Sequence, residues 1–220
     1  MSSLRWSYLV LAMFAIVLLV SCSSDQKSAN NPETVSASTT KSTPKMPQPI
    51  TAAKALDKMQ GFAQKQWAAD AMPVNVESEP NSEANGQDGK ATVWTATFGS
   101  MQRGEIRTFH WSGSLEANAP VSGVSAAPMQ SAMTPDMASR MFQAFLLKTD
   151  TDQMAANAQK HGGEAILKKF PDQQMKYVVV FDSKSNAPVC YVIFGEDLKK
   201  NNGYGVFNAM SGNFLHGGKG

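Results

Sequence analysis

The sequence is poor in the residue types that build disulfides, metal sites and strongly charged surfaces. Its 220 residues include two cysteines and three histidines, and 20 basic side chains nearly balance 18 acidic ones. The resulting net charge of +2 argues against nucleic acid or another polyanion as the main partner. His110, His161 and His216 are far apart, and no spacing places two of them on one face as metal ligands. The methionines form no Met-x-x-Met cluster that would suit copper(I). We therefore predict no metal site and no cofactor, and a surface or capping role for the histidines.

The sequence also lacks a convincing catalytic constellation. Cys190 lies in an apolar run with no basic neighbour to lower its pKa, which favours a place in the core. Asp150 and Asp152 flank a residue at a predicted helix start, where carboxylates suit the positive end of the helix dipole. Residues 38–41 have the Ser-x-x-Lys spacing of penicillin-recognising enzymes, but no Ser-Asp-Asn or Lys-Thr-Gly partner follows. We predict that the protein is not an enzyme; a hydrolase assembled from scattered residues is the open alternative.

The N-terminus carries the clearest signal. Arg5 precedes an apolar run of about a dozen residues, which suits a signal peptide and is too short to span a bilayer. The run closes with residues 19–22, Leu-Val-Ser-Cys, which resemble the lipobox of bacterial lipoproteins. This resemblance implies that residues 1–21 are removed by cleavage between Ser21 and Cys22, and that the Cys22 thiol carries the diacylglycerol. The alternative is an ordinary secretory signal followed by a chance cysteine.

The lipobox implies a lipid-anchored protein outside the cytoplasm, held at the membrane by more than one acyl chain. Ser23 follows the modified residue where an Asp would favour inner-membrane retention, so we expect the outer membrane, facing the periplasm, if the cell has two. With Cys22 lipidated, Cys190 is the only free thiol and no intrachain disulfide can form. Residues 22–49 are rich in Ser, Thr, Asn, Lys and Pro, which predicts a flexible tether.

Beyond the tether, hydrophobic periodicity predicts two sets of elements. In residues 50–115, apolar residues at three- and four-residue steps predict a helix over 52–71 that Thr51 caps. Alternation predicts strands over 92–98 and 106–111. Residues 116–148 are expected to be a connection with a short helix over 135–143, because the stretch from 113 to 135 is composed loosely of Ala, Ser, Pro and Met.

Residues 149–220 repeat this order. A helix is predicted from Asp150 to Gly162-Gly163, with a further turn or two over 164–169. Three strands are predicted over 177–181, 189–194 and 204–210, the last after an Asn-Asn-Gly turn. Residues 93–99 align with 189–195, and each segment is followed by Ser-Gly and a leucine, which indicates an internal repeat of one helix and a meander.

Residues 205–215 resemble the PepSY family, whose module is one helix on an antiparallel sheet that ends in a Val-x-x-Asp-Ala-x-Thr-Gly type turn. Asn208 stands where that family often has Asp, and Ser211 stands in place of Thr. The resemblance covers about residues 150–215 well and 52–115 weakly. It implies an α+β fold with two PepSY-like units, and a module that binds or restrains partner proteins without being an enzyme.

Together these patterns predict a membrane-anchored, extracytoplasmic binding or regulatory module. Its partner is expected to be an envelope protein or peptidase, held as an extended peptide by exposed strand edges or by a groove between the two units. The alternative is a small-ligand carrier with a pocket between helix and sheet. Trp67, Trp94 and Trp111 are the candidate binding residues, as an aromatic platform for sugar or peptide, although their positions also suit core packing.

Overall fold

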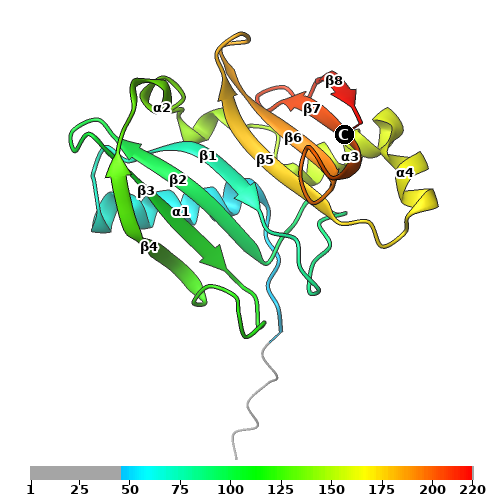
Figure 1. Ribbon diagram of the computed structural model, residues 1–220, viewed down its shortest axis with the longest axis horizontal. Helices are drawn as coiled ribbons and strands as arrows, with labels where there is room; N and C mark the ends of the chain where they lie inside the picture. The colour runs from blue at the N-terminus through cyan, green and yellow to red at the C-terminus, as the bar shows by residue number, and fades with distance from the viewer. Residues whose placement is uncertain (1–45, 220) are drawn as a thin grey trace, which may run out of the picture. The chain divides into compact units, whose positions relative to one another are not determined.

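The fold is built on one sheet of eight antiparallel strands in the order β4-β3-β2-β1-β5-β6-β7-β8 (Figure 1). The computed structural model describes residues 46–219. The predicted signal peptide, the cleavage between Ser21 and Cys22, the lipidation of Cys22 and most of the tether lie outside the described residues. The combination of helices with an antiparallel sheet confirms the α+β class.

The elements follow one another in two similar series. The first half, residues 52–132, contains α1 (Ala52–Gln66), β1 (Met72–Ser78), β2 (Val93–Ser100), β3 (Glu105–Ser112) and β4 (Gly123–Ala132). Short helices α2 (Pro135–Ser139) and η1 (Ala144–Leu146) follow it. The second half, residues 151–218, contains α3 (Thr151–Ala158), the π-helical segment η2 (Gln159–Gly163), α4 (Glu164–Lys169), β5 (Met175–Asp182), β6 (Ala187–Gly195), β7 (Asn201–Asn208) and β8 (Phe214–Gly218). The two segments aligned in the sequence form β2 and β6, which hold the same place in the two halves.

One face of the sheet is covered by helices and forms the core. α1 packs on β1, β2 and β3, and α3 packs on β6 and β7. A row of buried side chains crosses the strands on this face, and each member pairs with the next along the sheet: Phe109, Ala96, Val76, Val179, Cys190 and Phe207. The apolar faces of α1 and α3 close over this row as parts of one hydrophobic cluster. Burial of these side chains is the main stabilising contribution to the fold.

The two halves meet at the pairing of β1 with β5. This ladder is short, with three residue pairs centred on Val76 and Val179, whereas the ladder of β2 with β3 has eight. The backbone N–H of Tyr177 adds a hydrogen bond to the hydroxyl of buried Ser78, at 2.9 Å. The sheet is continuous here, so backbone pairing joins the two halves. The peptide site in a groove between the two units stays a prediction.

The N-termini of α1 and α3 also meet. The Asp150 carboxylate accepts hydrogen bonds from the backbone N–H of Thr151 (2.7 Å) and of Ala53 (3.0 Å), and the Thr151 hydroxyl accepts one from Ala52 N–H (3.1 Å). The predicted capping role of Asp150 is confirmed, and it extends to both helices. Thr51 occupies the cap position of α1, but its side chain makes no capping bond, which corrects the prediction for that residue.

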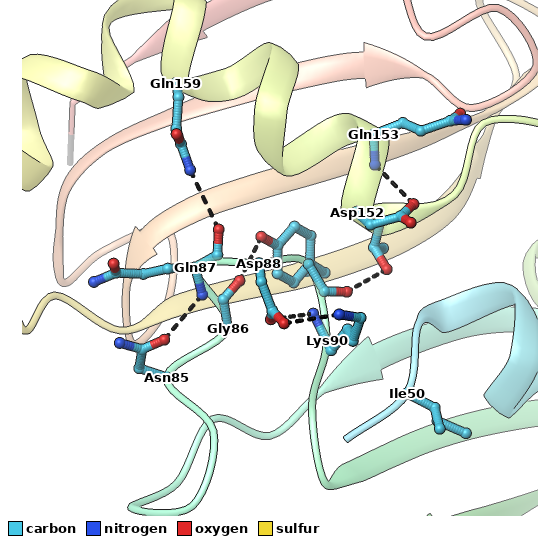
Figure 2. Close-up of polar contacts among 12 residues, drawn as sticks. Ile50, Asn85, Gly86, Gln87, Asp88, Lys90, Asp152, Gln153 and Gln159 are labelled. Atoms are coloured by element: carbon cyan, nitrogen blue, oxygen red, sulfur yellow. Dashed lines mark hydrogen bonds and ion pairs between the residues drawn. The ribbon is translucent and has the colours of Figure 1, made fainter. Parts of the chain in front are cut away.

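The loop between β1 and β2 makes a further connection between the halves. Figure 2 shows Gln159 of η2 pointing toward Gln87 of this loop, and its side-chain amide donates to the Gln87 carbonyl at 3.3 Å. The Thr151 hydroxyl donates to the Gly89 carbonyl at 2.6 Å. Gly89 has φ of +79°, and a Cβ there would lie 2.3 Å from the Thr151 carbonyl oxygen. Positive φ and close approach both require glycine at this position.

Several predicted elements are corrected by the structure. α1 ends at Gln66, and residues 67–71 form turns instead of continuing the helix. β1 lies where no strand was predicted, because Pro73 disguises its alternating Val74 and Val76. The predicted connection over 116–148 contains β4, which pairs with β3 and is too exposed to show a hydrophobic pattern. The three predicted strands of the second half are confirmed as β5, β6 and β7, but β7 begins at Asn201 and an additional strand, β8, follows.

Candidate functional site

The three predicted binding tryptophans lie in the core of the first half. Trp67, Trp94 and Trp111 are 9%, 0% and 5% exposed. The indole N–H of Trp94 donates to the Ile50 carbonyl at 2.9 Å, so its one polar group is satisfied. The core-packing interpretation is confirmed, and no exposed platform is built from these residues. A binding site has to be sought elsewhere.

The other candidate residues occupy separate places. Cys190 is fully buried in β6, and burial raises the pKa of its thiol well above the usual value. His110 is on β3, His161 is in η2 and His216 is on β8. Within the described residues, no group of three or more potential ligands could hold a metal ion.

A polar cluster on the uncovered face of the first half contains a hydroxyl, a carboxylate and an imidazole. The Thr95 hydroxyl donates to the Glu79 carboxylate and also contacts His110 Nδ1 at 2.9 Å. A hydroxyl nucleophile needs the imidazole between itself and the carboxylate, so that the ring can take its proton. Here the Thr95 hydroxyl lies between the carboxylate and the imidazole, so the three groups form a hydrogen-bonded cluster on the surface.

A cleft of about 850 Å³ lies in the second half. It lies between η2 and α4 on one side and β6, β7 and β8 on the other. Its aromatic lining consists of His161, Phe170, Phe194, Tyr204, Phe207 and Phe214. Glycines at positions 203, 205, 217 and 218 line the strands beside these rings. We define this hollow as the aromatic cleft.

The broken helix of the second half explains one wall of the aromatic cleft. α3 gives way to η2, where His161 leaves helical geometry and Gly162 adopts φ of +102°. A positive φ of this kind is readily available only to glycine, so the change of helix direction is fixed by the sequence. The chain then resumes as α4. The first half has an unbroken α1 of 15 residues in the corresponding position.

The floor of the aromatic cleft differs from the first half in one pair of facing strand residues. In the first half, Phe109 of β3 pairs with Ala96 and fills the space beneath α1. In the second half, Gly205 of β7 pairs with Val192, which aligns with Ala96 in the repeat. A phenylalanine in one half therefore corresponds to a glycine in the other. A Cβ on Gly205 would lie 2.8 Å from the ring of Phe207, so the rings of the chain itself cover the strand at this position, and they also line the cleft.

The surroundings of Phe109 show how completely the first half fills this space. Its ring centre lies 6.1 Å from that of Phe62, 5.9 Å from that of Trp67 and 5.5 Å from that of Phe98. Two residues earlier in β3, the Arg107 guanidinium lies 5.8 Å from the Phe109 ring centre. Gly203, two residues before Gly205, stands in the place of Arg107. The second half thus lacks both groups that close the first half.

The remaining rings of the aromatic cleft form a stack at its outer end. The rings of His161 and Phe214 are nearly parallel, with centres 4.4 Å apart, and Phe207 meets the Phe214 ring edge-on at 5.5 Å. Phe207 is fully buried, but Phe170 and Phe214 are each 38% exposed. Large, partly exposed apolar side chains at a concave surface are typical of binding sites.

The charges that line the aromatic cleft have one sign. Lys169 and Lys219 line it, and no aspartate or glutamate does. Neither lysine belongs to an ion pair among residues 46–219. The Lys169 ammonium lies 5.2 Å from the ring centre of Phe170. The site therefore offers apolar surface together with positive charge that no acidic side chain of residues 46–219 pairs with.

The two outer strands of the sheet differ in their ability to accept another strand. β4 contains Pro128, which has no N–H to donate, and its pairing with β3 is irregular near that point. β8 contains no proline and is exposed along its whole length, and among residues 46–219 it pairs only with β7. β8 also borders the aromatic cleft through Phe214, Gly217 and Gly218. A free backbone edge and a hollow thus lie side by side.

The uncovered face of the second half carries a smaller apolar hollow of about 530 Å³. Val178, Val180, Tyr191 and Ile193 line it, beside an ion pair of 3.0 Å between Lys176 and Glu77. Asp197 and Lys199 also line it, so this hollow contains charges of both signs, unlike the aromatic cleft.

Comparison with protein-family models, curated proteins and solved structures finds no match to this chain. Among residues 46–219, no helix combines the length and the apolar character needed to cross a bilayer.

The sequence patterns did not indicate the aromatic cleft. The patterns predict a turn at Gly203 and a strand that contains Gly205, and they place Phe214 after the last strand. The alignment of the two halves contains the relevant signal. When the third strand of each half is aligned as well, a glycine takes the position of Phe109. Without that alignment, the substitution could not be recognised.

Proposed function

We propose that this protein is a membrane-anchored, extracytoplasmic binding module without enzymatic activity, which holds an extended segment of an envelope protein or peptidase at β8 and the aromatic cleft. The observation that supports this function most directly is that a free strand edge lies beside an open hollow lined by aromatic side chains. The proposal assigns the second half to binding and the first half to support.

Strand addition accounts for both parts of this site. An extended peptide that pairs with an edge strand gains main-chain hydrogen bonds, and its alternate side chains point to one side, where pockets select among them. β8 has five residues, so a bound segment of similar length would direct two or three side chains toward the helix-covered face. The aromatic cleft is on that face, because buried Phe207 lines it.

The anchor gives the binding module its mechanism. A lipid on Cys22 and a flexible tether would confine the domain near the membrane surface, which raises its effective concentration toward other envelope proteins. The resemblance of residues 150–215 to PepSY modules supports the same function, since such modules are thought to bind or restrain partner proteins. Binding of a peptidase segment would then restrain that enzyme without any chemistry in this chain.

A small-ligand carrier is the second candidate, favoured by the location of the aromatic cleft between helix and sheet. Its volume of about 850 Å³ falls within the range of small-molecule sites. The residues that line it differ from the Trp67 and Trp94 expected for a carrier. A ligand that raises the thermal unfolding temperature of the protein at stoichiometric concentration, while no peptide competes with it, would support this function instead.

Site-specific crosslinking in the native envelope tests the proposal. Ala165 is exposed on α4 and lines the aromatic cleft, whereas Ala156 is equally exposed on α3 and lies outside it. A photoreactive phenylalanine analogue at each position, in the full lipidated chain, should give a defined protein adduct at 165 and none at 156. A chain that ends after the tether at Pro49, with the same analogue in place of Gln48, reports the contacts of the anchor alone. Adducts shared by all three chains, or no adduct at 165, would overturn the proposal.

A further inference from the structure

We infer that the segment bound at the aromatic cleft carries an aromatic side chain and, two residues away on the same face of the bound strand, a carboxylate. This inference rests on the proposed function, because it specifies which peptide the site selects. Two independent observations carry it: what fills the equivalent space in the first half, and which charges line the space in the second half.

The first half shows which group fits between these elements. Phe109 occupies the position of Gly205 and contacts aromatic neighbours on three sides. The second half retains an aromatic partner in Phe194, which aligns with Phe98, but the central ring is absent. A phenyl or phenol ring from a partner that enters the cleft would meet the rings of Phe170, Phe194 and Phe214, which line it. Ring pairs of this kind prefer edge-on or offset contact, which favours an aromatic ligand over a branched aliphatic one.

The chain itself cannot easily supply this ring from position 205. A Cβ on Gly205 would lie 2.8 Å from the ring of Phe207 and 3.5 Å from that of Phe214. The rings of the outer stack therefore occupy the route by which a side chain would leave this strand. A ring that enters from the solvent side, above Phe170 and Phe214, meets partly exposed surface instead.

The charges specify the second feature of the ligand. Lys169 and Lys219 line the aromatic cleft without a carboxylate partner among the described residues. In the adjoining hollow, Glu196 is already paired with Lys200 at 2.6 Å, and Asp172 is the other acidic residue in its lining. A carboxylate beside the bound ring would face the two lysines, whereas a cationic group would be repelled by them.

Binding of short peptides to the full protein tests this inference. The probes are four fluorescein-labelled hexapeptides of one Ala and Thr framework that contain Phe-Thr-Glu, Phe-Thr-Lys, Leu-Thr-Glu or Ala-Thr-Glu at the centre, because residues two apart share a face of the strand. We expect the Phe-Thr-Glu peptide to bind roughly tenfold more tightly than the Phe-Thr-Lys and Ala-Thr-Glu peptides, and more tightly than the Leu-Thr-Glu peptide. The preference for Glu over Lys should weaken as salt is raised.

Variants of the protein locate the binding. Ala165→Trp places a ring at the mouth of the aromatic cleft and should abolish binding of all four peptides, whereas Ala156→Trp should leave binding unchanged. The double variant Lys169→Gln with Lys219→Gln should remove the preference for Glu over Lys and retain the preference for Phe over Ala. Lys168→Gln is the matched control, because Lys168 is exposed on the same helix and does not line the aromatic cleft.

The outcomes separate this inference from the proposed function. Equal binding of the four peptides, abolished by Ala165→Trp, would overturn the inference and retain the peptide-binding function. Absence of binding by any peptide, together with no envelope adduct at position 165, would overturn both. Saturable binding of oleate that Ala165→Trp abolishes, without peptide binding, would also overturn both and favour the carrier.

Discussion

The two halves of this protein have the same order of strands and opposite uses of the space beneath their helices. In the first half, unbroken α1 covers Phe109, which contacts three other rings. In the second half, the helix changes direction at Gly162 and Gly205 replaces the central ring. The comparison teaches that two halves with the same strand order can differ in packing, so that one has a filled core where the other has an open cleft.

The outer strands differ in the same direction. β4 has a proline and an irregular ladder, which protect the edge of the first half from pairing with another strand. β8 has no proline, and no strand of the described part of the chain lies on its outer side. The half with a filled interior therefore also has a protected edge, and the half with a hollow interior has an open one.

The largest loss of stability should come from removing a buried ring from the core of the first half. Phe109→Ala removes a fully buried ring and should destabilise the protein by about 3–5 kcal/mol, through lost transfer free energy and the cavity left behind. Phe214→Ala removes a ring that is already 38% exposed and should cost about 1 kcal/mol. Urea unfolding of both variants measures the difference. Equal losses would mean that the aromatic cleft is as important to stability as the filled core, and would break the comparison.

Removal of the shared helix cap should have the next largest effect. Asp150→Ala leaves the N–H groups of Ala53 and Thr151 without their acceptor and should cost about 2 kcal/mol. Thr51→Ala, at the corresponding position of α1, removes a hydroxyl that has no hydrogen-bond partner and should cost less than about 0.5 kcal/mol. Thermal unfolding of the two variants provides the measurement. A larger loss for the Thr51 variant would contradict the assignment of the cap to Asp150.

Two glycines in the helices should respond with opposite signs. Gly162→Ala forces a side chain into φ of +102° and should destabilise the protein by about 1–2 kcal/mol, although no neighbouring atom obstructs its Cβ. Gly61→Ala, inside regular α1 and equally unobstructed, should stabilise it by about 0.5–1 kcal/mol. Denaturation midpoints report both changes. Stabilisation by Gly162→Ala would show that the helix break is not enforced by its backbone angle.

The smallest expected signal concerns the single thiol of the second half. In a Cys22→Ser variant, Cys190 should not react with iodoacetamide in the native state and should react fully in urea. Burial raises its pKa, so the thiolate does not form as the pH increases from 7 to 9, and the native labelling rate should stay nearly constant. Mass spectrometry of labelled protein measures this rate. A rise that follows the titration of an ordinary thiol would show that the core beneath α3 opens easily, unlike that of the first half.

Much of the fold could be predicted from local patterns. The three- and four-residue spacing of Leu56, Met59 and Ala63 indicated α1, and the alternation of Trp94, Ala96 and Phe98 indicated β2. β4 could not be predicted, because its small and exposed side chains have no hydrophobic alternation. The short interruption by Pro73 concealed β1 in the same way. Local patterns report burial, and these strands are determined mainly by pairing with their neighbours.

The candidate site was less predictable than the fold, for a related reason. Trp67, Trp94 and Trp111 drew attention as large aromatic residues, yet large aromatic residues are also the ones that fill a core. The aromatic cleft depends on Gly203 and Gly205, which are informative only when compared with Arg107 and Phe109 across the repeat. An absent side chain gives no signal in a single sequence until its structural counterpart is known.

The short seam between β1 and β5 has a consequence for how the chain folds. Every other pair of adjacent strands is consecutive in the sequence, whereas the seam joins residues such as Ser78 and Tyr177, which are 99 positions apart. Contacts between sequence neighbours form quickly and distant ones slowly, so we expect each meander to assemble first and the seam to close last. Until closure, β1 and β5 present unpaired edges of matching register. Two nascent copies can join through these edges and exchange halves, so slow closure of the seam would favour intertwined dimers.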